Sequence, residues 1–71
     1  MKTESAIVTA NGEQRRIDLP CSIDDFLGRS GWRSTQVVVE YNGRVVPRNK
    51  LRQVPLMDGD QLEIIVPVAG G

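Results

Sequence analysis

The sequence predicts an α+β fold, in which a mixed, mostly antiparallel sheet carries one helix on a single face. Five short segments have the alternating or β-branched pattern of strands, and one segment between the second and third has apolar residues at helical spacing. Asn-Gly or Asp-Gly pairs separate several of the strand segments, as expected for tight turns. The 71 residues suffice for one small domain, which we expect to span 1-66, followed by a flexible tail at 67-71.

A β-hairpin is predicted near the beginning of the sequence. Residues 5–10 and 13–19 have strand-like patterns, and Asn11-Gly12 lies between them. This pair suits a type I′ turn, because both central residues of that turn need positive φ. Pro20 follows the second segment and ends the hairpin.

A short helix is predicted after the hairpin, with Ser22 as its N-cap and Gly31 at its end. Its first turn is acidic, which suits the positive end of the helix dipole. Its apolar stripe follows the i, i+3, i+4 spacing, with Ile23, Phe26 and Leu27. Ser30 falls on the expected inner side, so we expect Trp32, just beyond the helix, to supply the missing apolar bulk.

Three further segments complete the predicted sheet, at residues 36–41, 44–46 and 61–66. Asn42-Gly43 and Asp58-Gly59 mark tight turns before the second and third of these segments. Residues 48–57 are expected to be irregular, with one 3₁₀ turn near 49–51.

Alternation along the strands divides the side chains between the two faces of the sheet. The set expected to point towards the helix is Val8, Ala10, Ile17, Leu19, Val37, Val39, Tyr41, Leu62, Ile64 and Val66. Ile7, Val38 and Ile65 then point to the opposite face, which no helix covers. They are either scattered surface aliphatics or a docking patch for a partner, and both interpretations stay open.

Composition argues against several kinds of partner. Nine basic and nine acidic residues cancel, so no overall field favours nucleic acid or a membrane. Basic residues do gather at Arg15-Arg16 and at Arg44, Arg48, Lys50 and Arg52, either as a solvated surface or as a landing site for an acidic protein. Without a secretion signal or an apolar run of ~20 residues, we expect a cytoplasmic protein.

Composition also argues against an enzyme. Histidine is absent, which removes the side chain most used for acid–base work near neutral pH. The single cysteine, Cys21, precedes the helix N-cap, where packing against Phe26 forms a hydrophobic staple, so we interpret it as structural. The acidic pairs at 24–25 and 58–60 suit capping and turns better than catalysis or metal binding. We expect no catalytic residue, metal or bound cofactor.

The last residues carry the most specific functional signal. Five residues follow the expected last strand and extend about 16 Å at ~3.3 Å each. Gly70 and Gly71 lack a Cβ, so this end can enter a narrow channel and adopt any backbone angle. The terminal carboxylate, with a pKa near ~3.5, is ionised at neutral pH and is a poor electrophile, so it needs activation, most simply as an acyl-adenylate.

Three stretches of the sequence form a recognisable set: Asn42-Gly-Arg-Val-Val-Pro-Arg48, Met57-Asp-Gly-Asp60 and Val68-Ala-Gly-Gly71. Together they resemble the ThiS family of sulfur carriers in thiamin biosynthesis. The spacing from hairpin to helix to tail is similar as well, so the resemblance spans nearly the whole chain. Ser30 departs from the family, where an apolar residue is usual, and this bears only on helix packing.

The resemblance implies a ubiquitin-like β-grasp fold and a defined chemistry. A ThiF-type enzyme would adenylate the Gly71 carboxylate with MgATP, and sulfur would then replace the adenylate to give a thiocarboxylate. A thiazole synthase (ThiG-type) would accept that sulfur. Gly71 would carry the sulfur and Gly70 would give it access, while Ile7, Val38, Ile65 and Val68 are candidates for the partner-facing surface.

Other members of this group leave alternatives open. The Pro67–Gly71 ending is also similar to the small subunit of molybdopterin synthase, although that relative generally lacks the Val-Pro-Arg of residues 46–48. Carriers for cysteine or methionine synthesis share the same signature. A ubiquitin-like protein modifier, joined through Gly71 to a lysine, and an interaction module with an inert tail are the remaining candidates.

Overall fold

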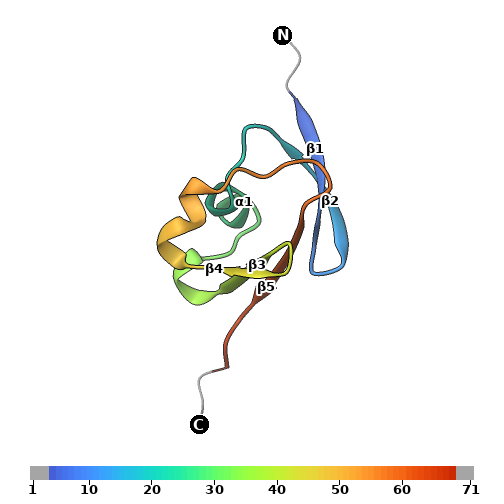
Figure 1. Ribbon diagram of the computed structural model, residues 1–71. Coiled ribbons are helices and arrows are strands. Elements are labelled where there is room, and N and C mark those ends of the chain that lie inside the picture. Colours follow the sequence, from blue (N-terminus) through green and yellow to red (C-terminus); the bar gives the residue numbers. More distant parts are fainter. Residues whose placement is uncertain (1–3, 69–71) are drawn as a thin grey trace.

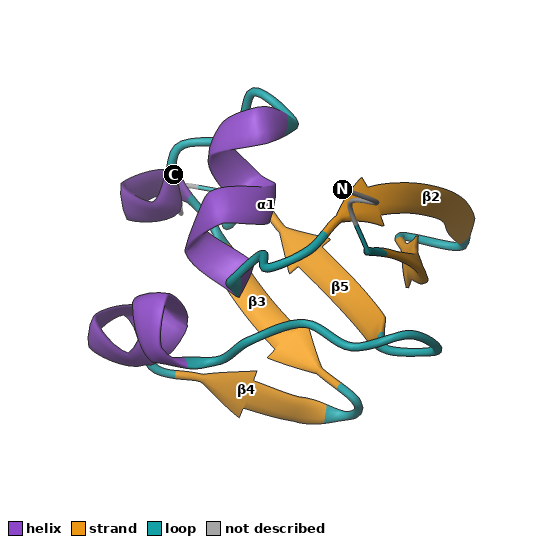
Figure 2. Cartoon of the chain, turned by 90° about the horizontal axis from the view of Figure 1, so that it is seen from above, coloured by secondary structure: helices purple, strands orange, loops and turns teal. Residues whose placement is uncertain are grey.

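A five-stranded sheet with the strand order β2-β1-β5-β3-β4 forms the framework of the molecule (Figure 1). The computed structural model describes residues 4–68. The strands are β1 (Ser5–Ala10), β2 (Glu13–Asp18), β3 (Val38–Tyr41), β4 (Arg44–Val46) and β5 (Gln61–Ile65). Helix α1 (Ile23–Arg29) lies against one face, and two 3₁₀ helices, η1 (Ser34–Gln36) and η2 (Arg48–Gln53), lie in the connections (Figure 2). The predicted α+β fold is therefore confirmed.

The last strand in sequence lies at the centre of the sheet. β5 pairs with β1 in parallel and with β3 in antiparallel fashion, and the other two pairings are the hairpins β1–β2 and β3–β4. The two hairpins are thus joined to each other only through β5. This arrangement makes the sheet mixed and places the end of β5 in its middle.

Both hairpin turns have the backbone conformation that their Asn-Gly pairs predict. Asn11 and Gly12 have φ of 51° and 81°, and Asn42 and Gly43 have φ of 48° and 87°. Glycine adopts such angles without steric cost, and asparagine tolerates them better than other residues with a Cβ. The local sequence therefore sets the register of each hairpin.

The ends of α1 are held by backbone and side-chain hydrogen bonds. At the N-terminus, Ser22 Oγ accepts from the Asp25 N–H at 3.0 Å, and the Asp25 carboxylate accepts from the Ser22 N–H at 3.1 Å, which forms a capping box. At the C-terminus, the Trp32 N–H donates to the Leu27 carbonyl at 2.8 Å and Gly31 has φ of 84°, as in a Schellman motif.

Two expectations about the helix end are wrong. Ser30 is the C-cap and is exposed, because the helix stops at Arg29 before Ser30 can turn inwards. Trp32 adds no bulk to the core, since it lies on the surface with 36% of its area accessible.

The core lies between α1, η2 and the inner face of the sheet. Its buried side chains are Ala6, Val8, Ala10, Ile17, Cys21, Ile23, Phe26, Leu27, Val37, Val39, Leu51, Leu56, Leu62 and Ile64. Leu19 and Tyr41, which were predicted to face the helix, are partly buried and pack against this cluster. Three predicted strand bounds are wrong. β2 stops at Asp18, before Leu19, and β3 starts only at Val38, because Gln36 belongs to η1. β5 stops at Ile65, which leaves Val66 exposed at 53%. Within residues 4–68, no helix is long and apolar enough to span a membrane.

Candidate functional site at the end of β5

The residues after β5 leave the sheet into solvent. Val66, Pro67 and Val68 are all exposed, and Val68 has 92% of its surface accessible. Gly70 and Gly71, predicted to give access and to carry the reactive carboxylate, lie outside the described residues. The boundary predicted between residues 66 and 67 stays a prediction, although the last strand ends one residue earlier than expected.

The side chain of Asn11 holds the end of β5 from which these residues depart. Asn11 Oδ1 accepts from the Ile64 N–H at 2.7 Å, and Nδ2 donates to the Ile64 carbonyl at 3.2 Å. The Asn11 backbone N–H donates to the Leu62 carbonyl at 3.0 Å. β1 ends at Ala10, but the side-chain amide of Asn11 continues its pairing with β5 by one more residue, Ile64.

The start of β5 is held by a buried carboxylate. Asp60 is 8% exposed, and its Oδ2 accepts from the Met57 N–H at 2.7 Å and from the Tyr41 hydroxyl at 2.9 Å. Its Oδ1 accepts from Asn42 Nδ2 at 3.1 Å. Burial, together with the Asp60 hydrogen bond, raises the pKa of Tyr41. Asn42 Oδ1 accepts in turn from the Gln61 N–H at 2.8 Å, so both ends of β5 are fixed by an asparagine from an Asn-Gly turn.

Sequence reasoning missed these roles of Asn11 and Asp60. The Asn-Gly pair predicts a turn, but the partner of the side-chain amide depends on the strand order, which alternation does not give. Asp60 was correctly interpreted as a turn residue, and the structure adds its contact with β3 through Tyr41. Asp58 has a simpler role, because its Oδ1 accepts only from the Ile7 N–H, at 2.7 Å.

The sheet face opposite α1, here called the outer face, carries the predicted docking residues. Val38 and Ile65 are cross-strand partners on this face, with 36% and 42% of their surfaces exposed. Ile7 is not beside them. Its carbonyl accepts from the Gly59 N–H at 2.9 Å. Gly59 lies six residues before Ile65 in the sequence, so Ile7 and Ile65 are about 20 Å apart along the strand direction. The structure therefore joins Val38 and Ile65 and leaves Ile7 apart.

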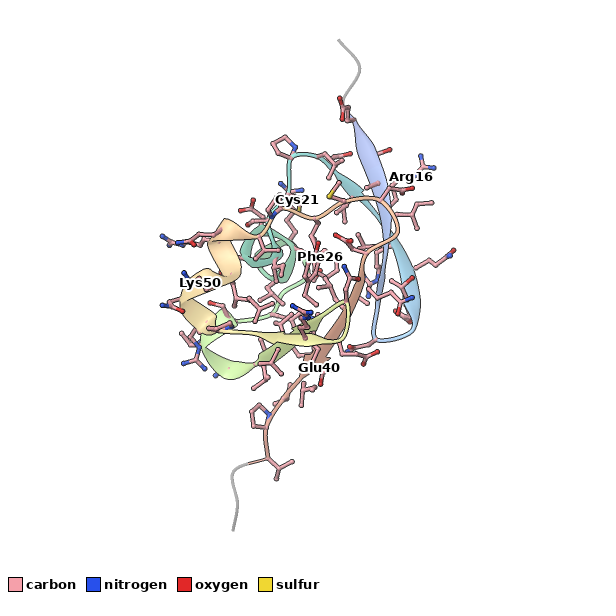
Figure 3. All side chains as sticks on the ribbon, in the orientation of Figure 1. Arg16, Cys21, Phe26, Glu40 and Lys50 are labelled. Atoms are coloured by element: carbon pink, nitrogen blue, oxygen red, sulfur yellow. The ribbon has the colours of Figure 1, made fainter. Side chains whose placement is uncertain are left out.

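Several basic side chains have structural partners. The Arg48 guanidinium donates to the Ser34 and Thr35 carbonyls at 3.1 and 2.9 Å and so holds η1. Arg29 donates to the Asp18 carbonyl at 3.0 Å. Arg48 thus fixes the local chain, while Lys50 stands exposed on η2 (Figure 3).

Cys21 has the environment of a structural residue. Its side chain is 1% exposed, in the same buried cluster as Phe26 (Figure 3). Burial raises the pKa of the thiol, the nearby Arg29 lowers it by less, and Asp25 raises it further. A buried thiol kept in its protonated form is a poor nucleophile at neutral pH. Among residues 4–68, no group of three or more His, Cys, Asp or Glu side chains is placed to hold a metal ion.

These features define a class of protein. A mixed sheet with one helix on its inner face and a central last strand, from which an exposed segment departs, is a ubiquitin-like β-grasp domain. The model of the ThiS family matches residues 8–71. The chain belongs to the ThiS family.

Solved structures and a curated relative agree with this family. The chain is similar to the crystal structure of the thiamine biosynthesis protein ThiS from Geobacter metallireducens, with 26% identity and a TM-score of 0.79 over 92% of this chain and 99% of that one. The solution structure of a thiamine biosynthesis protein from the same organism gives 26% identity and a TM-score of 0.74 over 92% and 87%. A thiazole synthase from Paramagnetospirillum magneticum (strain ATCC 700264 / AMB-1) is 39% identical over 61 residues, which are 86% of this chain and 19% of that protein. The chain thus spans about a fifth of that relative.

Proposed function

We propose that this chain is a sulfur carrier of thiamin biosynthesis, with the carboxylate of Gly71 as its working group. The observation that carries the proposal is the exposed segment after β5, in a chain that the ThiS family matches from residue 8 to residue 71. The six residues that follow Ile65 have a contour length of at most ~20 Å, which suffices to reach into a partner's active site. The carrier itself needs no catalytic side chain.

The chemistry proceeds in two displacements. A carboxylate oxygen of Gly71 attacks the α-phosphorus of MgATP in a ThiF-type enzyme. The bond from the α-phosphorus to the oxygen that bridges to the β-phosphate breaks, and pyrophosphate leaves. A sulfur nucleophile at the oxidation level of sulfide then attacks the acyl carbon, and AMP leaves. The product is a thiocarboxylate, which a thiazole synthase of the ThiG type uses as its sulfur source.

The thiazole synthase of Paramagnetospirillum magneticum supports this choice of acceptor. A segment similar to most of this chain is part of that protein, so a domain of this kind and a thiazole synthase share one polypeptide there. Such a link raises the effective concentration of one part for the other.

Intact mass spectrometry tests the proposal. After incubation with a ThiF-type enzyme, MgATP and a sulfide source, the chain should gain the mass difference between sulfur and oxygen. Deleting Gly71 should abolish this gain and pyrophosphate release. Glu4→Gln, which removes an exposed charge just before β1, is the matched control and should behave as the unaltered chain. Adducts on lysine would instead indicate a protein modifier, and an unchanged mass with no pyrophosphate would refute the proposal.

A further inference from the structure

Gly28 belongs to α1 although no contact within the described fold requires a glycine there. Its backbone is helical, in contrast to that of Gly31, whose φ of 84° favours glycine. A Cβ added to Gly28 would meet no atom of the described residues within 4 Å. Glycine is the poorest helix former after proline, so the residue weakens the helix without a packing reason. Its effect is to leave open space beside the helix.

A surface hollow of about 310 Å³ lies at this open space, between α1 and η1. Its apolar lining consists of Leu27, which is buried, and Trp32, which is 36% exposed. The volume is at the lower end of the range for ligand sites, ~300–1,000 Å³, and suits one aliphatic side chain with its neighbouring backbone. Because α1 covers one face of the sheet (Figure 2), the hollow lies on the side of the molecule away from the outer face.

Positive charge surrounds this hollow. Arg33 lines it directly. The Arg48 guanidinium donates to two backbone carbonyls of η1 at 3.1 and 2.9 Å, and Arg52 lies 3.8 Å from the carboxylate of Asp24, which also lines the hollow. Three guanidinium groups thus stand against one carboxylate. This surplus favours an occupant that carries carboxylates of its own.

We propose that this site, made of Asp24, Leu27, Gly28, Trp32 and Arg33 and here called the Trp32 hollow, binds an acidic peptide segment of a protein partner. An aliphatic side chain of the segment, such as leucine, would lie over the glycine against the apolar lining. Carboxylates on either side of it would meet the surrounding guanidinium groups. No residue of β5 or of the segment after it lines the hollow, so such a partner leaves the end of the chain accessible.

The chemistry of the Trp32 hollow distinguishes a peptide from other anions. Single-stranded nucleic acid is bound along a basic groove with successive aromatic side chains, whereas the lining here contains one aromatic residue. A small inorganic anion would leave the apolar lining uncovered. A peptide carboxylate pairs with a guanidinium in bidentate geometry and can flank an aliphatic side chain. Tryptophan and arginine are also the residues most enriched at the energetic centres of protein interfaces.

Fluorescence of Trp32, the only tryptophan of the chain, measures binding directly. The probe is an acetylated and amidated peptide, Glu-Asp-Leu-Asp-Glu. Its neutral analogue is Gln-Asn-Leu-Asn-Gln, and Glu-Asp-Ala-Asp-Glu lacks the aliphatic side chain. The acidic leucine peptide should change the emission saturably, and both analogues should bind at least about tenfold more weakly. Added salt should weaken binding of the acidic peptide, since the charges involved are exposed.

Gly28→Gln tests the position of the site. The new side chain fills the open space and replaces glycine by a better helix former, so binding should weaken at least about tenfold while the melting temperature stays equal or rises. Ser5→Gln adds the same side chain at an exposed position of β1. It is the matched control, and its Kd for the acidic peptide should equal that of the unaltered chain.

Weaker binding by Gly28→Gln without a lower melting temperature supports the inference, because a glycine with a purely structural role would change stability alone. The absence of a saturable change with the acidic peptide overturns it, as do equal affinities for the acidic and neutral peptides, an equal Kd in Gly28→Gln, or an equal loss in Ser5→Gln. Tighter binding of an oligothymidylate of the same net charge also overturns it and indicates a nucleic-acid site. Pyrophosphate release reports separately on the proposed function, since peptide binding requires no adenylation.

Discussion

Asn11 pairs with Ile64 through its side chain as one strand residue pairs with another through its backbone. The amide supplies an acceptor at 2.7 Å and a donor at 3.2 Å to the two backbone groups of a single residue. Fifty-three positions separate the two residues in sequence. A turn residue of the first hairpin thereby fixes the last buried residue before the exposed segment.

Asn11→Gly tests this contact, because glycine keeps the positive φ of the turn and removes only the amide. We expect the free energy of unfolding to fall by about 1–3 kcal/mol, since the two backbone groups of Ile64 lose their partners. Urea denaturation measures this change. The Ile64 amide proton should also exchange faster, while that of Glu63, which faces β3, serves as the internal control. An unchanged exchange rate at Ile64 would contradict this role of Asn11.

Asp60→Asn is expected to be far more destabilising than Asp58→Asn. The three donors around the Asp60 carboxylate occupy both of its oxygens, so an amide must turn its NH₂ group towards at least one of them. The expected loss is about 1.5–3 kcal/mol, as for hydrogen bonds to a charged group. Asn at position 58 can still accept from the Ile7 N–H through its carbonyl oxygen, so this control should lose less than about 1 kcal/mol. Equal losses in thermal or urea unfolding would show that the Asp60 network is unimportant.

The Cys21 thiol should react slowly while the chain is folded. Burial both raises its pKa and blocks access, so labelling with a thiol reagent at pH 8 should be on the order of 100-fold slower than in urea. Absorbance of the released chromophore follows the reaction. Cys21→Ala should still be adenylated and should still take up sulfur. A folded Cys21→Ala protein that fails at sulfur uptake would show that the thiol takes part in transfer.

Ser22→Ala should weaken the start of α1 and change the acid sensitivity of the fold. Loss of the N-cap is expected to cost about 0.5–2 kcal/mol at pH 7. The hydrogen bond from the Ser22 N–H, followed by that of the Ser22 hydroxyl, lowers the pKa of Asp25 from its ordinary value of 3.8. The resulting stabilisation is therefore complete above pH 4 and is lost as the pH falls through the lowered pKa.

Urea unfolding at pH 7, 5, 3 and 2 measures this dependence. The decline in stability below pH 4 should be smaller in Ser22→Ala than in the unaltered chain. Asp25→Asn has no titrating group at this position, so its stability should likewise fall less below pH 4 than that of the unaltered chain. If both variants follow the unaltered chain down to pH 2, other carboxyl groups determine its acid sensitivity.

Most of the fold could be predicted because its signals are local. The Asn-Gly turns, the Ser22 cap and the Gly31 stop each depend on a few adjacent residues, and all three lie where the sequence indicates. The errors fall at element ends. Val66 continues the alternation of β5, but β3 ends its pairing at the Val38–Ile65 pair, so no strand is left for Val66 to pair with.

The candidate site could be predicted only in part, because it depends on which strands are neighbours. Alternation correctly placed Ile7, Val38 and Ile65 outside the core, but it carries no information on their spacing across the sheet. The parallel pairing of β1 with β5 moves Ile7 away from Ile65, and the antiparallel register brings Glu40 opposite Glu63. Both relationships arise from strand order and register. The docking roles of Ile7, Val38, Ile65 and Val68 stay predictions.

The central position of β5 has a consequence for biosynthesis. A ribosome releases both hairpins before the strand that joins them, and an isolated two-stranded hairpin is marginally stable at best in water. We expect an interrupted translation product that ends at Asp60 to lack a stable sheet, which far-ultraviolet circular dichroism of that fragment would show. The strand that completes the fold is also the one that leads to the proposed working end, so folding of the domain and synthesis of that end finish together.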